Sequence, residues 1–506
     1  MRIGFAYQKS GFFVDESLSI SISTNGIEVP KMPNGEYFGK ELKEKVYFDD
    51  NSISDLLHDL KELWKNNYGD GAAHPNLYYT LLRAWSFDIK SGDFGWIKSR
   101  GIGLNLIFFA LGFFVAFALM TKIFSRHSLF VPLFLAFAFW NSVSVTNSIF
   151  IRPYALQEML LLVFALNCFV FYRLRFTSAK DAFKTHKWFF IWFIFATALL
   201  CLSHYFSLFF IAFAFIFLAI LSRKNIVPLS IVVVGSFAIT QILYLGYFSS
   251  LLGGYRAKES TDKLLLGDFW QNLNATFFSG ADIITTHFCN LYGFAIICVA
   301  CGIAIYHILD STKNAESTQS TQNFVFLYGI FAVALLWFCL IFFVAPYKEL
   351  RYVMPIFPFL YFGVLILLSF IKKPLLQGVL GVAFVGSLFV NYNVNYLYKE
   401  PFIFTQNPKI PVLVHLPNTS WEQGHFLFAL NDTQKYIVES DATKLVEKIK
   451  DFDAFYVISE TPFRVPDRFR MGVLQTLYDT FFFILFEHQN IINKQTLKNN
   501  AHFLLQ

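Results

Sequence analysis

The sequence has little charge, and it lacks the short motifs that mark soluble nucleotide-binding and hydrolytic enzymes. Only 15% of the 506 residues are Asp, Glu, Lys or Arg, whereas 55% are hydrophobic and the mean hydropathy is +0.48. This apolar fraction is far larger than a soluble chain of the same length needs for its core. No P-loop, Rossmann glycine fingerprint, HExxH pair or nucleophile elbow occurs in the chain. The composition therefore predicts a polytopic membrane protein and gives no support to soluble nucleotide chemistry.

Cysteine is scarce as well. Of the six cysteines only Cys289 lies outside a long apolar run, so no disulfide framework is implied. Cys298 and Cys301 form the one CxxC pair, which we interpret as small packing residues in an apolar helix and not as half a zinc site. The net charge of +6 does not indicate a nucleic-acid partner, because the basic residues cluster in short loops that orient membrane spans.

Long apolar stretches are what the chain has in abundance. About ten of them approach the length that crosses a bilayer. A polar break at residues 203–205 divides one apolar run that is too long for a single crossing. The ten expected spans cover residues 104–124, 128–147, 154–172, 188–203, 206–221, 227–250, 290–309, 323–345, 353–371 and 375–391.

The loops between these stretches predict their orientation. One alternate set holds twelve Lys or Arg and only three acidic residues, which favours the cytoplasm for that set. The opposite set then faces outward, toward the periplasm if the protein lies in a bacterial inner membrane. We expect three regions: an external first loop over 1–100, a transmembrane bundle over 101–391 and an external α/β domain over 392–506. Because residues 1–13 hold no span and no signal peptide, we also expect that a transmembrane helix ahead of Gly11 is missing.

Two of the external regions have local patterns of their own. Ser52 and Asp55 have the spacing of a helix-capping box, and apolar residues then recur at helical spacing up to Trp64. This predicts an amphipathic helix in the membrane interface, with a second short helix after His74. In the tail, strand-like runs at 412–415, 454–458 and 481–486 and a helical stretch at 442–450 predict a small α/β domain.

Acidic pairs supply the candidate catalytic groups. Asp15 and Glu16 are adjacent carboxylates beside an apolar segment, where a carboxylate can deprotonate a hydroxyl or hold a metal ion. A divalent cation on this pair is left open, and a solvated loop charge is the simpler alternative. Asp49 and Asp50 are interpreted as a cap and a surface charge.

Basic and aromatic residues at the expected outer ends of spans form a second candidate group. Arginine grips two phosphate oxygens at once, so positive charges at these ends suggest phosphate binding, with snorkelling as the alternative. His74 and His204 each have a structural explanation too, as a helix-start residue and as a helix–helix hydrogen bond. The candidates are Arg152, Lys348 and Arg351 for phosphate, and His74, Tyr78, Tyr79, Tyr154, His204 and Tyr352 for the substrate pocket.

The order and spacing of these motifs resemble the GT-C integral-membrane glycosyltransferases, most of all the branch related to protein O-mannosyltransferases and the lipid A aminoarabinose transferase. The resemblance covers about residues 11–391. Two departures are the absence of the usual helix before the acid and Asn76, which stands where a second proline is common. The motifs are Val14-Asp15-Glu16, His74-Pro75-Asn76-Leu77-Tyr78-Tyr79, Arg152-Pro153-Tyr154, Ser203-His204-Tyr205 and Arg351-Tyr352-Val353-Met354-Pro355.

The resemblance implies hexosyl or pentosyl transfer from a polyprenyl-phosphate sugar to an acceptor lipid, glycan or protein, at an external site and with inversion. It also implies that Asp15 is the base. Such a leaving group needs little acid catalysis, but it does need positive charge on the departing phosphate. We expect Glu16 and His74 to orient the acceptor and the basic group to hold the phosphate. A lipid or sugar flippase and a non-catalytic membrane scaffold are the rival functions.

Overall fold

The computed structural model describes most of the chain in two compact units. The first unit comprises Met1–Gln8, Trp64–Leu82 and Gly101–Leu397, and the second comprises Lys9–Leu63, Arg83–Arg100 and Tyr398–Gln506. The residues described are 1–25, 32–47, 52–66, 75–87, 94–174, 179–253, 269–310, 319–345, 347–397, 409–415, 427, 430–449, 452–459, 467–477 and 481–488.

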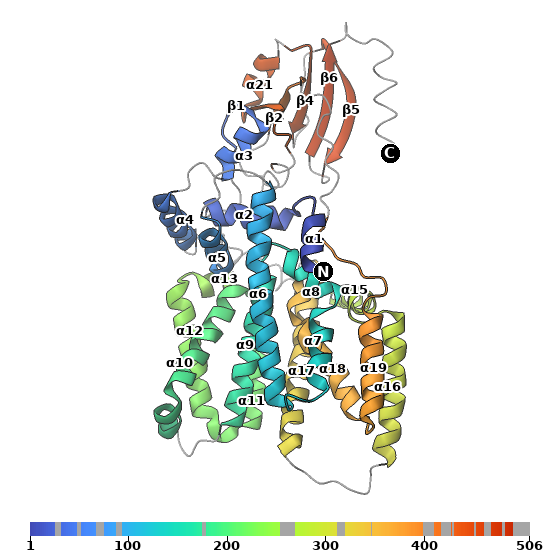
Figure 1. Cartoon of the computed structure of the whole chain (residues 1–506). Coiled ribbons are helices and arrows are strands. Elements are labelled where there is room, and N and C mark those ends of the chain that lie inside the picture. The colour runs from blue at the N-terminus through green and yellow to red at the C-terminus, as the bar shows by residue number, and fades with distance from the viewer. Residues whose placement is uncertain are drawn as a thin grey trace. The chain divides into compact units, whose positions relative to one another are not determined.

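The first unit is a bundle of apolar helices, which confirms the polytopic helical fold expected from the composition (Figure 1). Within the described part of the chain, five helices are long and apolar enough to cross a membrane on their own. Two further spans are broken pairs, and three apolar helices are shorter. Together these cover all ten stretches expected from the sequence. The five long helices are α6 (Phe94–Ile123), α9 (Tyr154–Arg173), α10 (Ala179–Ser203), α12 (Ile226–Leu243) and α17 (Gln319–Val344).

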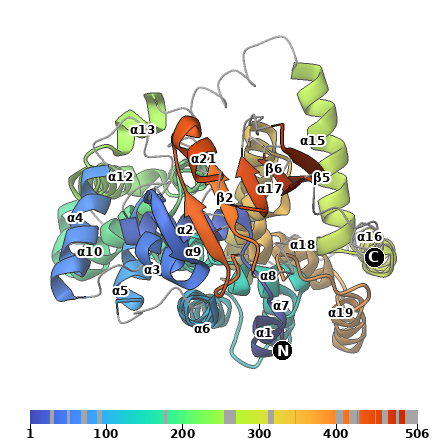
Figure 2. The same cartoon turned by 90° about the horizontal axis from the view of Figure 1, so that it is seen from above.

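The shorter and broken helices complete this bundle. Figure 2 shows α10 beside α12 and α16 beside α19, and both pairs are in contact. The shorter apolar helices are α11 (Ser207–Leu221), α18 (Phe357–Ser369, preceded by the turn η4, Met354–Ile356) and α19 (Pro374–Ser387). The broken pairs are α7 (Phe130–Phe139) with α8 (Ser142–Ile149), bent by 56°, and α15 (Phe269–Ile283) and η2 (Ile284–Phe288) with α16 (Leu291–Asp310), bent by 90°.

The break between α7 and α8 has a local cause. The Asn141 side chain accepts a hydrogen bond from the backbone N–H of Ser144 at 2.8 Å, which caps a new helix where α7 has ended. Every residue of α8 is buried, although five of its eight side chains are polar. The sequence predicts one span here, and the structure shows two half-helices because the asparagine competes with the backbone for hydrogen bonds.

The outer surface of the bundle stays apolar. Trp188, Ile216, Val234 and Leu375 are each more than half exposed, and each lies on an apolar helix. In water such a surface is unfavourable, whereas in lipid it is the ordinary exterior of a spanning helix. The exposed side chains therefore agree with a membrane as the solvent of this unit.

The second unit is built on a mixed six-stranded sheet in the order β1-β3-β2-β4-β6-β5. Its buried core includes Leu413, Ile437, Phe455 and Phe486 on the strands and Leu445 on α21. The predicted strands and helix of the tail are confirmed as β2, β4, β6 and α21. The elements are β1 (Gly35–Phe38), β2 (Val412–His415), β3 (Lys435–Val438), α21 (Ala442–Ile449), β4 (Ala454–Ser459), β5 (Phe469–Leu477) and β6 (Phe481–His488).

One edge strand of this sheet comes from the first 100 residues. β1 pairs antiparallel with β3, with Gly35 opposite Val438 and Phe38 opposite Lys435. The expected external α/β domain is thus not made from the tail alone. Four residues with alternating exposure give no apolar run, which explains why the sequence pattern did not indicate this strand.

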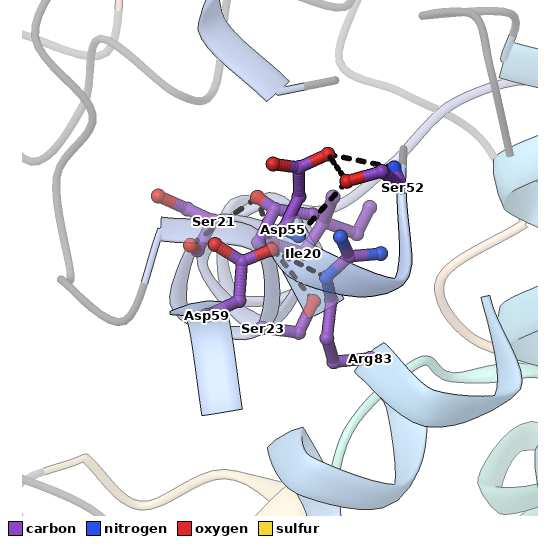
Figure 3. Close-up of polar contacts among 8 residues, drawn as sticks. Ile20, Ser21, Ser23, Ser52, Asp55, Asp59 and Arg83 are labelled. Carbon is purple, nitrogen blue, oxygen red and sulfur yellow. Dashed lines mark hydrogen bonds and ion pairs between the residues drawn. The ribbon is translucent and has the colours of Figure 1, made fainter. Parts of the chain in front are cut away.

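Three helices of the N-terminal part belong wholly or largely to this second unit: α2 (Val14–Asn25), α3 (Gly39–Tyr47) and α4 (Ile53–Asn66), whose first eleven residues fall within it. The predicted capping box of α4 is confirmed, because the Ser52 N–H donates to Asp55 Oδ2 at 2.6 Å and the Asp55 N–H donates to Ser52 Oγ at 3.2 Å (Figure 3). Arg83 lies beside it and donates to Asp59 at 2.6 Å. These contacts fix where α4 begins and how it packs.

Candidate functional site

Arg152 lies in the short link between α8 and α9, and its guanidinium is buried. Its Nη1 contacts the Tyr79 hydroxyl at 3.4 Å. The neighbouring Tyr78 hydroxyl donates to Asn105 Oδ1 at 3.1 Å, and the Asn105 amide donates to the carbonyl of Phe150 at 2.6 Å. Helix α5 (Leu77–Trp85) therefore contributes two tyrosines that anchor the segment carrying Arg152.

His204 follows the last residue of α10 and packs against the first residue of α9. The ring centroids of His204 and Tyr154 are 5.7 Å apart. The imidazole Nδ1 accepts the backbone N–H of Phe206 at 3.2 Å, so in the neutral ring the proton lies on Nε2. Burial, and then the nearby charge of Arg152, lowers the pKa of His204 to about 3. The histidine is thus a neutral hydrogen-bond donor at ordinary pH.

Arg351 is buried in the 3₁₀ turn η3 (Leu350–Tyr352), with its guanidinium carbon 5.1 Å from the centroid of the Tyr352 ring. Its Nε is 3.0 Å from a carboxylate oxygen of Glu349. The Tyr352 ring lies 6.0 Å from the ring of Phe206, which in turn is 5.0 Å from the imidazole of His204. Aromatic rings therefore connect Arg351 to the side chains around Arg152.

Lys348 occupies a different kind of position. Its ammonium donates to the carbonyls of Phe342 and Phe343, each at 2.7 Å. These carbonyls belong to the last turn of α17, where a positive charge stabilises the helix end. Lys348 thus holds the end of α17, and the chain continues from it to Arg351.

The two acidic candidates lie at the start of α2 in the second unit. Asp15 is partly buried, whereas Glu16 is fully buried. One oxygen of Glu16 is 2.8 Å from the ammonium of Lys9, which is also fully buried, and accepts the backbone N–H of Phe13 at 2.8 Å. Glu16 is therefore engaged in fixing the first turn of α2.

His74, Asp49 and Asp50 lie outside the described residues. Among the residues that the structure does describe, no group of three or more His, Cys, Asp or Glu side chains could hold a metal ion.

Sequence reasoning missed a cluster of tyrosines near His204. The hydroxyls of Tyr205 and Tyr244 are 3.0 Å apart, and the Tyr205 and Tyr247 rings are 5.3 Å apart. Tyr244 follows the last residue of α12, and Tyr247 begins α13 (Tyr247–Gly253). Tyr244 and Tyr247 fall inside the apolar stretch expected over 227–250, so no separate signal marked them, whereas the structure ends α12 at Leu243.

Comparison with known proteins gives fold similarities alone. No family model and no curated protein matches the chain. Its structure is similar to the Archaeoglobus fulgidus oligosaccharyltransferase in complex with zinc and sulfate, at 14% identity and a TM-score of 0.36, over 88% of this chain and 67% of that one. It is also similar to ArnT from Cupriavidus metallidurans bound to undecaprenyl phosphate, at 10% identity and a TM-score of 0.36, over 96% of both chains.

The apo form of the same ArnT gives a TM-score of 0.32 at 10% identity, over 92% of this chain and 95% of that one. These structures are of the GT-C kind that the sequence motifs resemble. Because the TM-scores are low, we argue the function from the chain's own residues.

Proposed function

We propose that this protein is a membrane glycosyltransferase that moves a sugar from a polyprenyl-phosphate donor to an acceptor hydroxyl, with inversion, at the outer face of the membrane. The observation that carries the proposal is the pair of buried guanidinium groups, Arg152 and Arg351, in loops at helix ends of an apolar bundle. A lipid phosphate is an anion attached to an apolar chain, so its binding site needs positive charge where a spanning bundle meets water.

The side chains between the two arginines support binding of a phosphate. His204 presents an N–H without carrying a charge. The Tyr79 hydroxyl contacts the guanidinium of Arg152, and the Tyr352 ring lies beside the guanidinium of Arg351. Donors that are fixed before the reaction stabilise the charge that develops on the leaving phosphate. Arg152 and Arg351 are the phosphate-binding residues of the proposal. Lys348 takes a positioning role, because its ammonium holds the last turn of α17 before the loop to Arg351.

The acceptor side of the proposal depends on Asp15. Inversion requires a single displacement, in which a base removes the proton of the acceptor hydroxyl while its oxygen attacks the anomeric carbon and the bond to the lipid phosphate breaks. We assign Asp15 as that base and His74 as a residue that orients the acceptor. Glu16 supports Asp15 indirectly, since its bond to Lys9 fixes the first turn of α2.

Transfer in vesicles tests the proposal. The purified full chain is reconstituted in lipid and given a labelled polyprenyl-phosphate sugar with candidate acceptors. We expect Asp15→Asn to lower the transfer rate by about 10²- to 10⁴-fold. Asp453→Asn, an exposed aspartate in the second unit, is the matched control. Normal turnover by Asp15→Asn would refute the base, and absence of transfer by the folded wild-type chain would refute the transferase.

A flippase is the second candidate, and one observation favours it. The buried half-helix α8 is lined by polar groups: Asn147 donates to the Glu158 carboxylate of α9 at 2.8 Å, and Arg2 donates to Ser144 at 2.7 Å. Broken helices and ionisable groups within a bundle are features of transport proteins. Translocation of the labelled lipid without transfer would support this function, whereas neither event would favour a scaffold.

A further inference from the structure

Three hydroxyl groups gather beside His204, on segments that follow α10 and α12. The hydroxyls of Tyr205 and Tyr244 are 3.0 Å apart, and Ser250 on α13 lies near both phenols. Tyr205 and Ser250 are partly exposed, whereas Tyr244 is fully buried. Tyr205 can therefore meet a ligand, with Tyr244 fixing its hydroxyl from behind.

The position of this hydroxyl cluster, Tyr205, Tyr244 and Ser250, relates it to the proposed phosphate site. Tyr205 directly follows His204 in the chain. It also lies close enough to Tyr79 for an electrostatic interaction, and Tyr79 contacts Arg152. A ligand with its phosphate at Arg152 and His204 would thus bring its next chemical group toward Tyr205.

The hydrogen-bonding capacity of the cluster hydroxyls indicates which ligand group lies next to the phosphate. Each hydroxyl has one proton to donate and two lone pairs that can accept. The hydrogen bond between Tyr205 and Tyr244 uses one proton, so each of the two oxygens keeps at least one lone pair for a partner outside. The cluster is therefore neutral and can both donate and accept, which suits a ligand hydroxyl, a neutral group that does the same, better than an anionic phosphate oxygen, which only accepts.

The aromatic rings add a second element of recognition. The ring of Tyr247 lies 5.3 Å from that of Tyr205 and 5.9 Å from that of Tyr244, measured between centroids. Sugars carry both hydroxyls and apolar C–H faces, and the latter pack well on aromatic side chains. No charge in the cluster would require a charged ligand.

We propose that Tyr205, positioned by Tyr244, is the subsite that binds a hydroxyl of the donor sugar and thereby determines which sugar is accepted. The inference rests on the proposed function, because it assigns the sugar half of a donor whose phosphate half binds at Arg152. The subsite is nevertheless distinct from the phosphate site, since the phosphate needs positive charge and the sugar needs neutral hydrogen-bonding groups.

The test compares two ligands that differ only in the sugar. Binding of polyprenyl phosphate and of a polyprenyl-phosphate hexose is measured for the reconstituted full chain and for Tyr205→Phe, Tyr244→Phe and Ser250→Ala. We expect Tyr205→Phe to weaken hexose-donor binding by about 2- to 10-fold, the effect of one lost hydrogen bond, and to leave polyprenyl phosphate binding unchanged. Tyr172→Phe is the matched control, since its hydroxyl bonds to the Gln322 carbonyl near the opposite end of α9.

A donor analogue that lacks the recognised hydroxyl gives a second readout. Removing the right hydroxyl should abolish the difference between wild type and Tyr205→Phe. Equal weakening of both ligands, or no change for either, would overturn the subsite. If the wild-type chain neither binds a polyprenyl-phosphate sugar nor transfers from it, the proposed function fails, and the subsite fails with it. If the wild-type chain binds and transfers but Tyr205→Phe does not weaken hexose-donor binding selectively, only the subsite fails.

Discussion

The imidazole of His204 packs against the ring of Tyr154, with 5.7 Å between centroids and an angle of 36° between the planes. One residue begins α9 and the other follows α10, so this contact joins two spans at their ends. The same imidazole is close enough to Arg152 to feel its charge. A second positive charge at this place would be unfavourable, and the neutral form of His204 is the one that fits.

His204 should therefore give the protein a measurable dependence of stability on pH. Its folded-state pKa of about 3 is below the ordinary value of 6.5, so the unfolded chain binds the extra proton between these values. Stability is then fully present above pH 6.5 and falls as the pH is lowered toward 3. Between pH 7.5 and pH 5 we expect a loss of about 2 kcal/mol from this group.

Thermal unfolding in detergent at these two pH values measures the effect. Tyr154 and Phe206 pack against the ring, and Arg152 lies nearby. His204→Gln removes the titrating imidazole and leaves these neighbours in place. The variant should lose less stability on acidification than the wild type does. Equal pH dependence of the two proteins would contradict the neutral imidazole.

Replacing Arg152 by lysine tests whether the planar guanidinium is needed. Lysine keeps the charge but cannot grip two phosphate oxygens at once. We expect Arg152→Lys to weaken binding of polyprenyl phosphate by about 10- to 100-fold, as for a lost charge-assisted hydrogen bond. Arg223→Lys, at an exposed position between α11 and α12, is the control. Unchanged affinity in Arg152→Lys, measured by ligand titration, would place the phosphate elsewhere.

The buried pair of Lys9 and Glu16 separates a structural role of Glu16 from a chemical one. Each single neutral variant, Lys9→Met or Glu16→Gln, leaves one charge buried and should cost about 3–5 kcal/mol of stability. The double variant removes both charges and should recover much of that loss.

Transfer rates of the same three variants decide the role. If Glu16 only positions Asp15, the rate should recover with the stability in the double variant. A double variant that is stable but remains slow would show that the Glu16 carboxylate acts on the acceptor itself.

The sequence predicted well those features that depend on local composition. Apolar runs of bilayer length became the helices of the bundle, and the strands β2, β4 and β6 lie where apolar stretches occur in the tail. The capping box of Ser52 and Asp55 formed because its partners are three residues apart. Local patterns of this kind need no knowledge of the rest of the fold.

Features that depend on distant partners could not be predicted in the same way. Nothing near Lys348 in the sequence shows that its ammonium holds the end of α17, because a loop lysine looks the same in either role. The bond between Lys9 and Glu16 and the cluster around Tyr205 depend likewise on how the chain turns. The structure places Arg152 beside Tyr79 and Tyr154 beside His204, and these individual partners could not be read from the sequence.

The pairing of β1 with β3 has a consequence for how the protein is made. Residues 35–38 leave the ribosome long before residues 435–438, and all of the spanning helices that the structure describes are synthesised between them. Because domains generally fold in the order of their synthesis, β1 must wait with an unpaired edge while the bundle inserts. A nascent chain halted before β3 would leave that edge available to chaperones, proteases or other chains. The β1–β3 pair can therefore form only after the spanning helices and β3 have been synthesised.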